Sequence, residues 1–148
     1  MNKEETTSKL DCMLKDVHTE KQAEEFISEH ISDSANRSFR EYLIDYATSS
    51  TIEMSEIINR SQLNKNYVYN IINGVTKRPG RDKVLALCIG AGMNRKETDR
   101  ALKLAGHNPL YPKDERDTRI IICLNNGMKN VLNVNLYLEQ HNIQLIEI

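Results

Sequence analysis

The segment from Asn64 to Gly74 constrains the fold of this chain more than any other stretch. Asn is among the residues that best accept hydrogen bonds from the free N–H groups at a helix start, so Asn64 is a strong N-cap. The apolar residues Val68 and Ile71 follow at helical spacing. Gly74 then favours a left-handed helix end. Because its flanks have helical spacing, the Asn-Gly pair indicates a helix end rather than a β-hairpin turn. We predict a short helix over residues 64–73.

A second short helix is predicted directly before this one. Ile57 and Ile58 supply its inward-facing residues, and Arg60-Ser61-Gln62 is the predicted turn. Two short helices joined by a tight turn are typical of a helix-turn-helix motif. In that motif the second helix packs one face on the first and keeps an opposite polar face free to meet base edges.

The predicted helix has such a polar face, formed by Asn66, Tyr69, Asn70 and Asn73 at spacings of three and four residues. An Asn amide both donates and accepts hydrogen bonds, which matches the edge of adenine in the major groove. Lys65 lies in the first turn, where a cation opposes the helix dipole. A nearby phosphate or guanine edge would offset that cost. The alternative interpretation is a solvated surface without a partner.

The rest of the chain is also predicted to be helical. Only six Gly and three Pro occur, and aromatic residues make up 5%, whereas an all-β sandwich needs more turn residues and alternating patterns. Capping-box spacings begin at Thr19 and Ser38, and Asn94-Arg95-Lys96-Glu97 opens another helix. Further helices are predicted over residues 81–91, about 113–126 and 131–140. Residues 143–148 alternate as a short strand or an extended tail would.

Charge divides the chain into three regions that we predict as domains. Residues 1–36 form an acidic helical N-terminal extension with 4 basic and 9 acidic residues. Residues 37–107 carry 12 basic and 7 acidic residues and hold the helix-turn-helix. Residues 108–148 carry 4 basic and 5 acidic residues and form a C-terminal helical extension. A basic middle region indicates an anionic partner, although scattered solvated charge would give the same count.

Further residues extend the pattern around the two short helices. The full set is Ile52, Val68, Ile71-Ile72-Asn73-Gly74, Arg78-Pro79 and the Leu-rich helix Val84–Ile89. In these residues the chain resembles a known family, the lambda-repressor-like (XRE-type) helix-turn-helix domains. The resemblance covers about residues 38–106, roughly half of the chain. The C-terminal stretch of the chain, HNPLYPKDERDTRIIICLNNGM, also resembles the tails of small Gram-positive bacterial regulators of this type.

The resemblance implies an all-α fold with a five-helix domain between the N-terminal and C-terminal extensions. It implies base contacts from the start of the recognition helix, and backbone-phosphate contacts from the loop that follows. The implied base contacts are Lys65, Asn66, Tyr69 and Asn70, and the implied phosphate contacts are Asn73, Lys77 and Arg78.

The sequence departs from the family pattern at three positions. Ile58 stands where Ala is usual, so we expect slightly wider helix spacing. Gln62 stands where Gly is usual in the turn, and a left-handed backbone costs more for Gln than for Gly. Glu53 replaces the Ser or Thr that commonly caps the first short helix.

Other function classes find little support in the sequence. No nucleophile elbow, P-loop or zinc-ligand pair occurs, so neither enzymatic activity nor a cofactor is predicted. Cys88 and Cys123 lie among aliphatic residues and are interpreted as core. No apolar run approaches the length of a membrane span, and we expect a cytoplasmic location.

We therefore predict a sequence-specific double-stranded DNA-binding protein, a bacterial transcriptional regulator. We expect it to act as a homodimer through residues outside the helix-turn-helix. Ile120–Leu124 and Ile143–Ile148 are the candidate dimer surfaces, although core packing is the favoured use of the first. The alternative is a protein-interaction module or antitoxin-like partner that keeps the fold without specific DNA binding. In that alternative, the acidic N-terminal helices contact a protein partner.

Overall fold

The computed structural model describes residues 19, 21–22 and 38–148. The chain divides into two units, Met1–Arg37 and Ser38–Ile148, and the fold described below is that of the second. The predicted N-terminal helices lie outside the described residues, apart from the capping box at Thr19. There, the Gln22 backbone N–H donates to Thr19 Oγ1 at 3.1 Å, and the Thr19 N–H donates to Gln22 Oε1 at 3.2 Å, as the spacing predicts.

The all-α prediction is confirmed for the described residues, in which every regular element is a helix. Residues 143–148 do not form a strand. The predicted and observed helix ends agree within about two residues, which is the usual uncertainty of helix boundaries. The helices are α3 (Phe39–Ser49), α4 (Met54–Ser61), α5 (Lys65–Ile72), α6 (Arg81–Ala91), α7 (Arg95–Leu104), α8 (Glu115–Asn125) and α9 (Val131–Gln140).

Side-chain caps explain where most of these helices begin. Ser38 and Asn64 accept hydrogen bonds from backbone N–H groups of the first turns of α3 and α5. Asn94 and Glu97 form a complete capping box at the start of α7. Glu53 precedes α4 without a side-chain cap, as its departure from the family pattern predicts.

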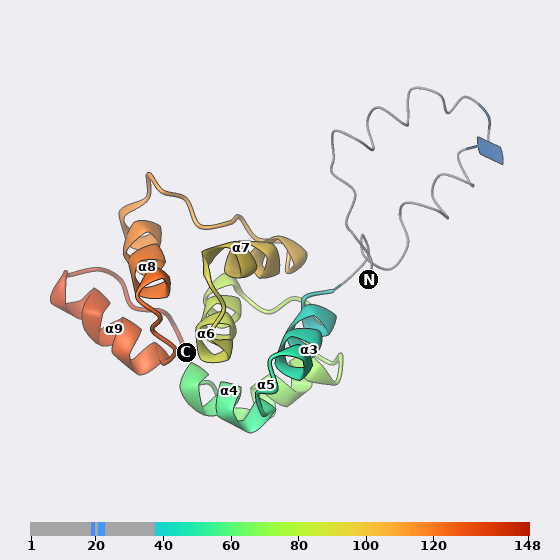
Figure 1. Ribbon diagram of the computed structural model, residues 1–148, viewed down its shortest axis with the longest axis horizontal. Coiled ribbons are helices and arrows are strands. Elements are labelled where there is room, and N and C mark those ends of the chain that lie inside the picture. The colour runs from blue at the N-terminus through green and yellow to red at the C-terminus, as the bar shows by residue number, and fades with distance from the viewer. Residues whose placement is uncertain (1–18, 20, 23–37) are drawn as a thin grey trace. The chain divides into compact units, whose positions relative to one another are not determined.

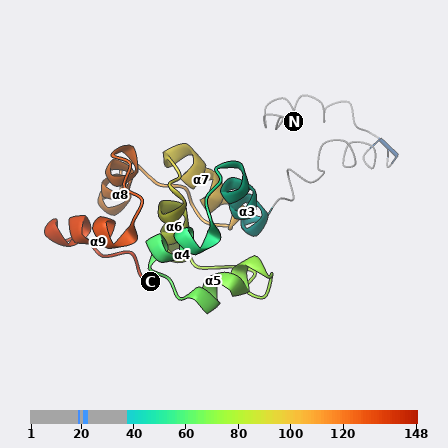
Figure 2. The ribbon, with the colours of Figure 1, turned by 60° about the horizontal axis from the view of Figure 1, so that its bottom comes forward.

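Helix α6 forms the centre of the unit. All eight residues from Val84 to Ala91 are buried, and in two views the helix lies between α3 and the α8–α9 pair (Figure 1; Figure 2). Its contact with α4 is unusually close. A Cβ added at Gly90 would lie 2.6 Å from the Ile57 carbonyl oxygen and 3.0 Å from the Ser61 nitrogen. The first helix of the motif therefore rests directly on the backbone of α6, which only Gly permits.

The C-terminal region, residues 108–148, belongs to the same unit as the five preceding helices. Within the apolar run Ile120–Leu124, only Ile122 is not fully buried. This run thus packs in the chain's own core, which was the favoured prediction, and does not form a free surface for a dimer.

The tail at residues 143–148 is extended and forms hydrogen bonds with side chains of the preceding helices. Asn135 accepts from the Ile146 N–H at 2.8 Å and donates to the Ile146 carbonyl at 3.1 Å, and the Ile146 side chain is buried.

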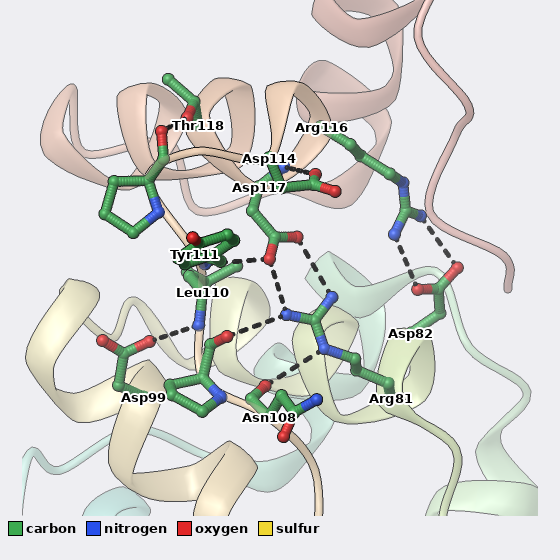
Figure 3. Close-up of polar contacts among 12 residues, drawn as sticks. Arg81, Asp82, Asp99, Asn108, Leu110, Tyr111, Asp114, Arg116, Asp117 and Thr118 are labelled. Atoms are coloured by element: carbon green, nitrogen blue, oxygen red, sulfur yellow. Dashed lines mark hydrogen bonds and ion pairs between the residues drawn. The ribbon is translucent and has the colours of Figure 1, made fainter.

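Two arginine–carboxylate pairs join the C-terminal region to the start of α6 (Figure 3). Arg81 binds both oxygens of Asp117 at 2.9 and 3.1 Å. Arg116 binds both oxygens of Asp82 at 3.0 and 3.2 Å. Since Arg81 and Asp82 are neighbours on α6, and Arg116 and Asp117 are neighbours on α8, the two bidentate pairs fix the relative position of the two helices.

Candidate nucleic-acid interface

The turn between α4 and α5 is short and contains a left-handed residue. Gln62 adopts the left-handed conformation, with φ of 62° and ψ of 10°. Its side-chain amide donates to the Asn59 carbonyl at 2.8 Å. The fully buried Ser61 hydroxyl donates to the Ile58 carbonyl at 2.7 Å and accepts from the Leu63 N–H at 3.2 Å. These local bonds hold the strained turn that the sequence predicted at Gln62.

Helix α5 has a buried face and an open face. Val68 and Ile71 are 0% and 1% exposed. Lys65, Asn66 and Asn70 are exposed on the other side. Asn64 sets the start of the helix by accepting from the N–H groups of the second and third helical residues, at 2.8 and 3.3 Å. The two faces lie on one short helix, as the polar and apolar spacing predicts.

Tyr69 lies between these two faces. It is half-buried and packs against the core, so only part of its ring is open to a ligand. The Lys65 ammonium lies 5.9 Å from the centre of this ring, within the range of a cation–π contact. This contact places the exposed Lys65 charge near the Tyr69 ring at the start of α5.

The loop after α5 continues the open face. Gly74 has a φ of 80° and reverses the chain. The N–H groups of Val75 and Thr76 then both donate to the Asn70 carbonyl, at 2.8 and 2.9 Å. The Arg40 guanidinium donates to the Ile72 carbonyl at the same helix end. The loop is thereby fixed against the last turn of α5.

The predicted phosphate-binding residues lie along this loop. Asn73, Lys77 and Arg78 are all exposed. They are followed by the buried Pro79, whose carbonyl lies 2.8 Å from His107 Nε2. A groove of about 720 Å³ runs beside the loop, between the start of α3 and the end of α7. The structure thus places Lys77 and Arg78 at the rim of a hollow, one loop away from the asparagines of α5.

The sequence analysis missed the residues of α4 that border this surface. A shallower groove of about 420 Å³ lies between α4 and α5. Ser55 and Asn59 line its α4 side and Lys65 and Tyr69 its α5 side. The three-to-four-residue spacing of Ser55, Asn59 and Gln62 was the available signal, because residues at that spacing share one helix face.

Ion pairing distinguishes two classes of basic residue in the described part of the chain. Arg60, Arg81, Arg95 and Arg116 each pair with a carboxylate. The cations of the candidate interface, namely Lys65, Lys77 and Arg78, make no ion pair with another described residue. Lys65, Lys77 and Arg78 therefore carry positive charge that no described carboxylate compensates, a property they share with other exposed basic residues such as Lys96 and Lys103.

The two cysteines in the described part of the chain are core residues. Cys88 and Cys123 are both buried, as predicted, and Cys12 lies outside the described residues. Burial raises the pKa of the Cys88 thiol far above its ordinary value, and it raises the pKa of Cys123 to about 11. Both thiols are thus protonated, and poor nucleophiles, at neutral pH.

Comparisons with known proteins add no relatives to this picture. No family model, curated protein or solved structure matches the chain. No helix in the described ranges is both long enough and apolar enough to cross a membrane. The functional argument therefore rests on the geometry and charge of the interface.

Proposed function

We propose that this chain is a sequence-specific double-stranded DNA-binding protein of the lambda-repressor-like, XRE type, and that it regulates transcription. In this proposal α5 enters the major groove and α4 lies across its edge. The observation that carries it is the division of α5 into two faces. One face is buried on the core through Val68 and Ile71, and the other presents exposed Lys65, Asn66 and Asn70.

The proposed contacts to DNA fall into two groups, those to base edges, which determine sequence preference, and those to backbone phosphates, which do not. Asn66, Asn70 and Tyr69 project from α5 toward the base edges, and Lys65 lies at its start. Lys77 and Arg78 project from the following loop, where side chains more often reach phosphates. Asn73, at the junction of helix and loop, contacts the backbone. The five helices α3–α7 supply the number of helices that the family domain has.

The proposal includes a homodimer, since readers of this type gain specificity by binding paired half-sites. The described surface outside the motif that best fits this role is apolar and lies on α9 and the tail. Its exposed members are Leu132, Leu136, Leu145 and Ile148, each between 40% and 54% exposed. Light scattering on the chain, free and bound to a duplex, tests this part; a monomer in both states contradicts it.

The salt dependence of duplex binding tests the function itself. Each phosphate contact releases counterions, so the logarithm of the binding constant falls linearly with the logarithm of the salt concentration. We expect Lys77→Ala and Arg78→Ala to weaken binding to all duplexes alike and to lower this slope by about one each. Lys113→Ala removes an exposed charge that lies outside the proposed interface and is the matched control.

Fluorescence anisotropy of the full chain with a labelled duplex, at several salt concentrations, measures this slope. Binding that does not change with salt contradicts the proposed phosphate contacts. A slope that falls equally in the Lys113→Ala control shows that the interface lies elsewhere. No binding to any duplex favours the protein-interaction module instead.

A further inference from the structure

The open face of α5 carries a chemically uniform set of polar groups. Asn66, Asn70 and Asn73 are exposed, and their side chains make no hydrogen bond with another residue of the described ranges. Exposed asparagines without such a bond also occur on α8 and α9, whereas Asn64 and Asn94 cap helices and Asn135 holds the tail. The amides of the open face are therefore available to a ligand.

An apolar side chain lies beside this row. Val75 is 71% exposed, the highest value among the large apolar residues described as exposed. Its backbone N–H donates to the Asn70 carbonyl at 2.8 Å, so Val75 is fixed next to the last turn of α5. Gly74, with its φ of 80°, makes this return of the chain possible. The open face of α5 is thus followed directly by an exposed aliphatic side chain, whose backbone is bonded to the last turn of the helix.

This combination matches one kind of base pair. In the major groove, an A·T pair presents the N7 acceptor and N6 donor of adenine, followed by the O4 acceptor and the 5-methyl group of thymine. An Asn amide satisfies the adenine edge, and an aliphatic side chain contacts the methyl group. Guanine is usually read by Arg or Lys, and Lys65 is the one cation among the exposed described residues of α5.

We propose that α5 and the loop after it select A·T base pairs, with Asn70 reading adenine and Val75 contacting the methyl group of a thymine. This inference rests on the proposed DNA-binding function and names the sequence class that the function requires. Asn66 lies one helical turn from Asn70, a rise of about 6 Å, which is roughly two base steps along a strand. It reads a second adenine nearer the start of α5.

The first experiment is a selection of bound sequences from a random duplex pool with the full chain. We expect A·T pairs at two or more positions of the recovered motif, and relaxed preference at one of them for Asn70→Ala. Salt-dependent binding with a G·C motif, or with no motif, overturns this inference and leaves the proposed function standing. Retention of no duplex overturns both.

The second experiment removes the 5-methyl groups of the thymines in the DNA site, one at a time. Each thymine of the selected site is replaced by uracil, which keeps the hydrogen-bonding groups and lacks the 5-methyl. We expect one such replacement to weaken binding of the unmodified chain about fourfold, the effect of losing one buried methyl contact. The same replacement should leave the affinity of Val75→Ala unchanged.

The control variant is Tyr111→Ala, which removes an exposed side chain from the loop before α8 and leaves both the α5 face and the proposed dimer surface intact. It should respond to uracil as the unmodified chain does. If Val75→Ala also responds in that way, Val75 does not contact the methyl group and the inference is wrong.

Discussion

Two loops of this molecule connect helices of the same unit but are held in different ways. The loop at residues 73–80 is held mainly by backbone hydrogen bonds to the Asn70 carbonyl of α5, with Arg40 and His107 bonded at its two ends, and it exposes Lys77 and Arg78. The loop at residues 105–114 is fixed by charged side chains of neighbouring helices. Asp99 accepts from the Leu110 N–H at 2.9 Å, and Asp117 accepts from the Tyr111 N–H at 3.0 Å (Figure 3).

The two loops differ in whether their charged groups are bonded within the protein or remain free to bind a ligand. In the second loop Arg81 donates to the carbonyls of Asn108 and Pro109 as well as to Asp117, so its donors are used within the chain. In the first loop the cations form no ion pair with a described residue, and the fold does not depend on them. A charge that the fold does not use is the one that a ligand can bind without unfolding the protein.

Among the polar residues that hold the second loop, the largest effect should follow from removal of Asp117. This carboxylate is 6% exposed and binds Arg81 through both oxygens. Asp117→Ala leaves the Arg81 guanidinium partly buried without its partner, and we expect a loss of about 3 kcal/mol in the free energy of unfolding. Denaturant titration measures it, and Lys113→Ala, with an expected change below about 0.5 kcal/mol, is the control. If Asp117→Ala and Lys113→Ala lowered the free energy of unfolding equally, the second loop would not depend on Asp117 for its stability.

A comparable contrast is expected between neighbours on α5. Ile71→Ala truncates a buried side chain and should destabilise the protein by about 2–5 kcal/mol. Asn70→Ala should leave the melting temperature unchanged but weaken binding to the preferred site by about 1–3 kcal/mol. Thermal melts and binding titrations of both variants separate the two roles. A stability loss in Asn70→Ala would show that the open face is part of the fold.

The smallest effect is expected at Asp82, in acid. Burial acts to raise the pKa of this carboxyl, but hydrogen bonds from Arg116 and from the Glu147 N–H outweigh burial and lower the pKa below its ordinary value. The stability that this carboxylate contributes is therefore complete above the unfolded-state pKa of about 3.9, and it is lost as the pH falls through the folded-state pKa.

Asp82→Asn tests this sign. The difference in unfolding free energy between the unmodified chain and the variant should be constant above about pH 5 and should shrink below about pH 4. Denaturant unfolding across this range measures it. A difference that grows in acid would mean that the pKa of Asp82 is raised in the folded protein.

Local signals made the helices and the open face predictable from sequence. The caps at Asn64 and Asn94 act over two or three residues, and the stripe of Val68 and Ile71 repeats within one helix. Each of these features is contained in a few consecutive positions. The left-handed Gln62 was also predictable, because the position within the motif demands that conformation.

The features that the sequence did not predict depend on residues far apart in the chain. Arg81 and Asp117 are 36 positions apart, and Arg116 and Asp82 are 34 apart. Nothing in a single sequence pairs one arginine with one aspartate across that distance. Of the two alternatives predicted for residues 143–148, a short strand or an extended tail that pairs with another part of the chain, the second is observed. Its partners on α6, α8 and α9 could not be identified from the local sequence.

The missing side chain of Gly90 has a consequence for how this protein can evolve. Where two helices pack through side chains, a substitution can be accommodated by a change of rotamer or by a smaller neighbouring residue. At Gly90 the neighbouring atoms of α4 belong to the backbone, so no substitution in α4 can make room for a larger side chain. Any residue other than Gly at position 90 would therefore force α4 and α6 apart. Under the proposed function, exposed residues of α5 could be exchanged to alter base preference, whereas the contact of α4 with α6 at Gly90 would have to be kept.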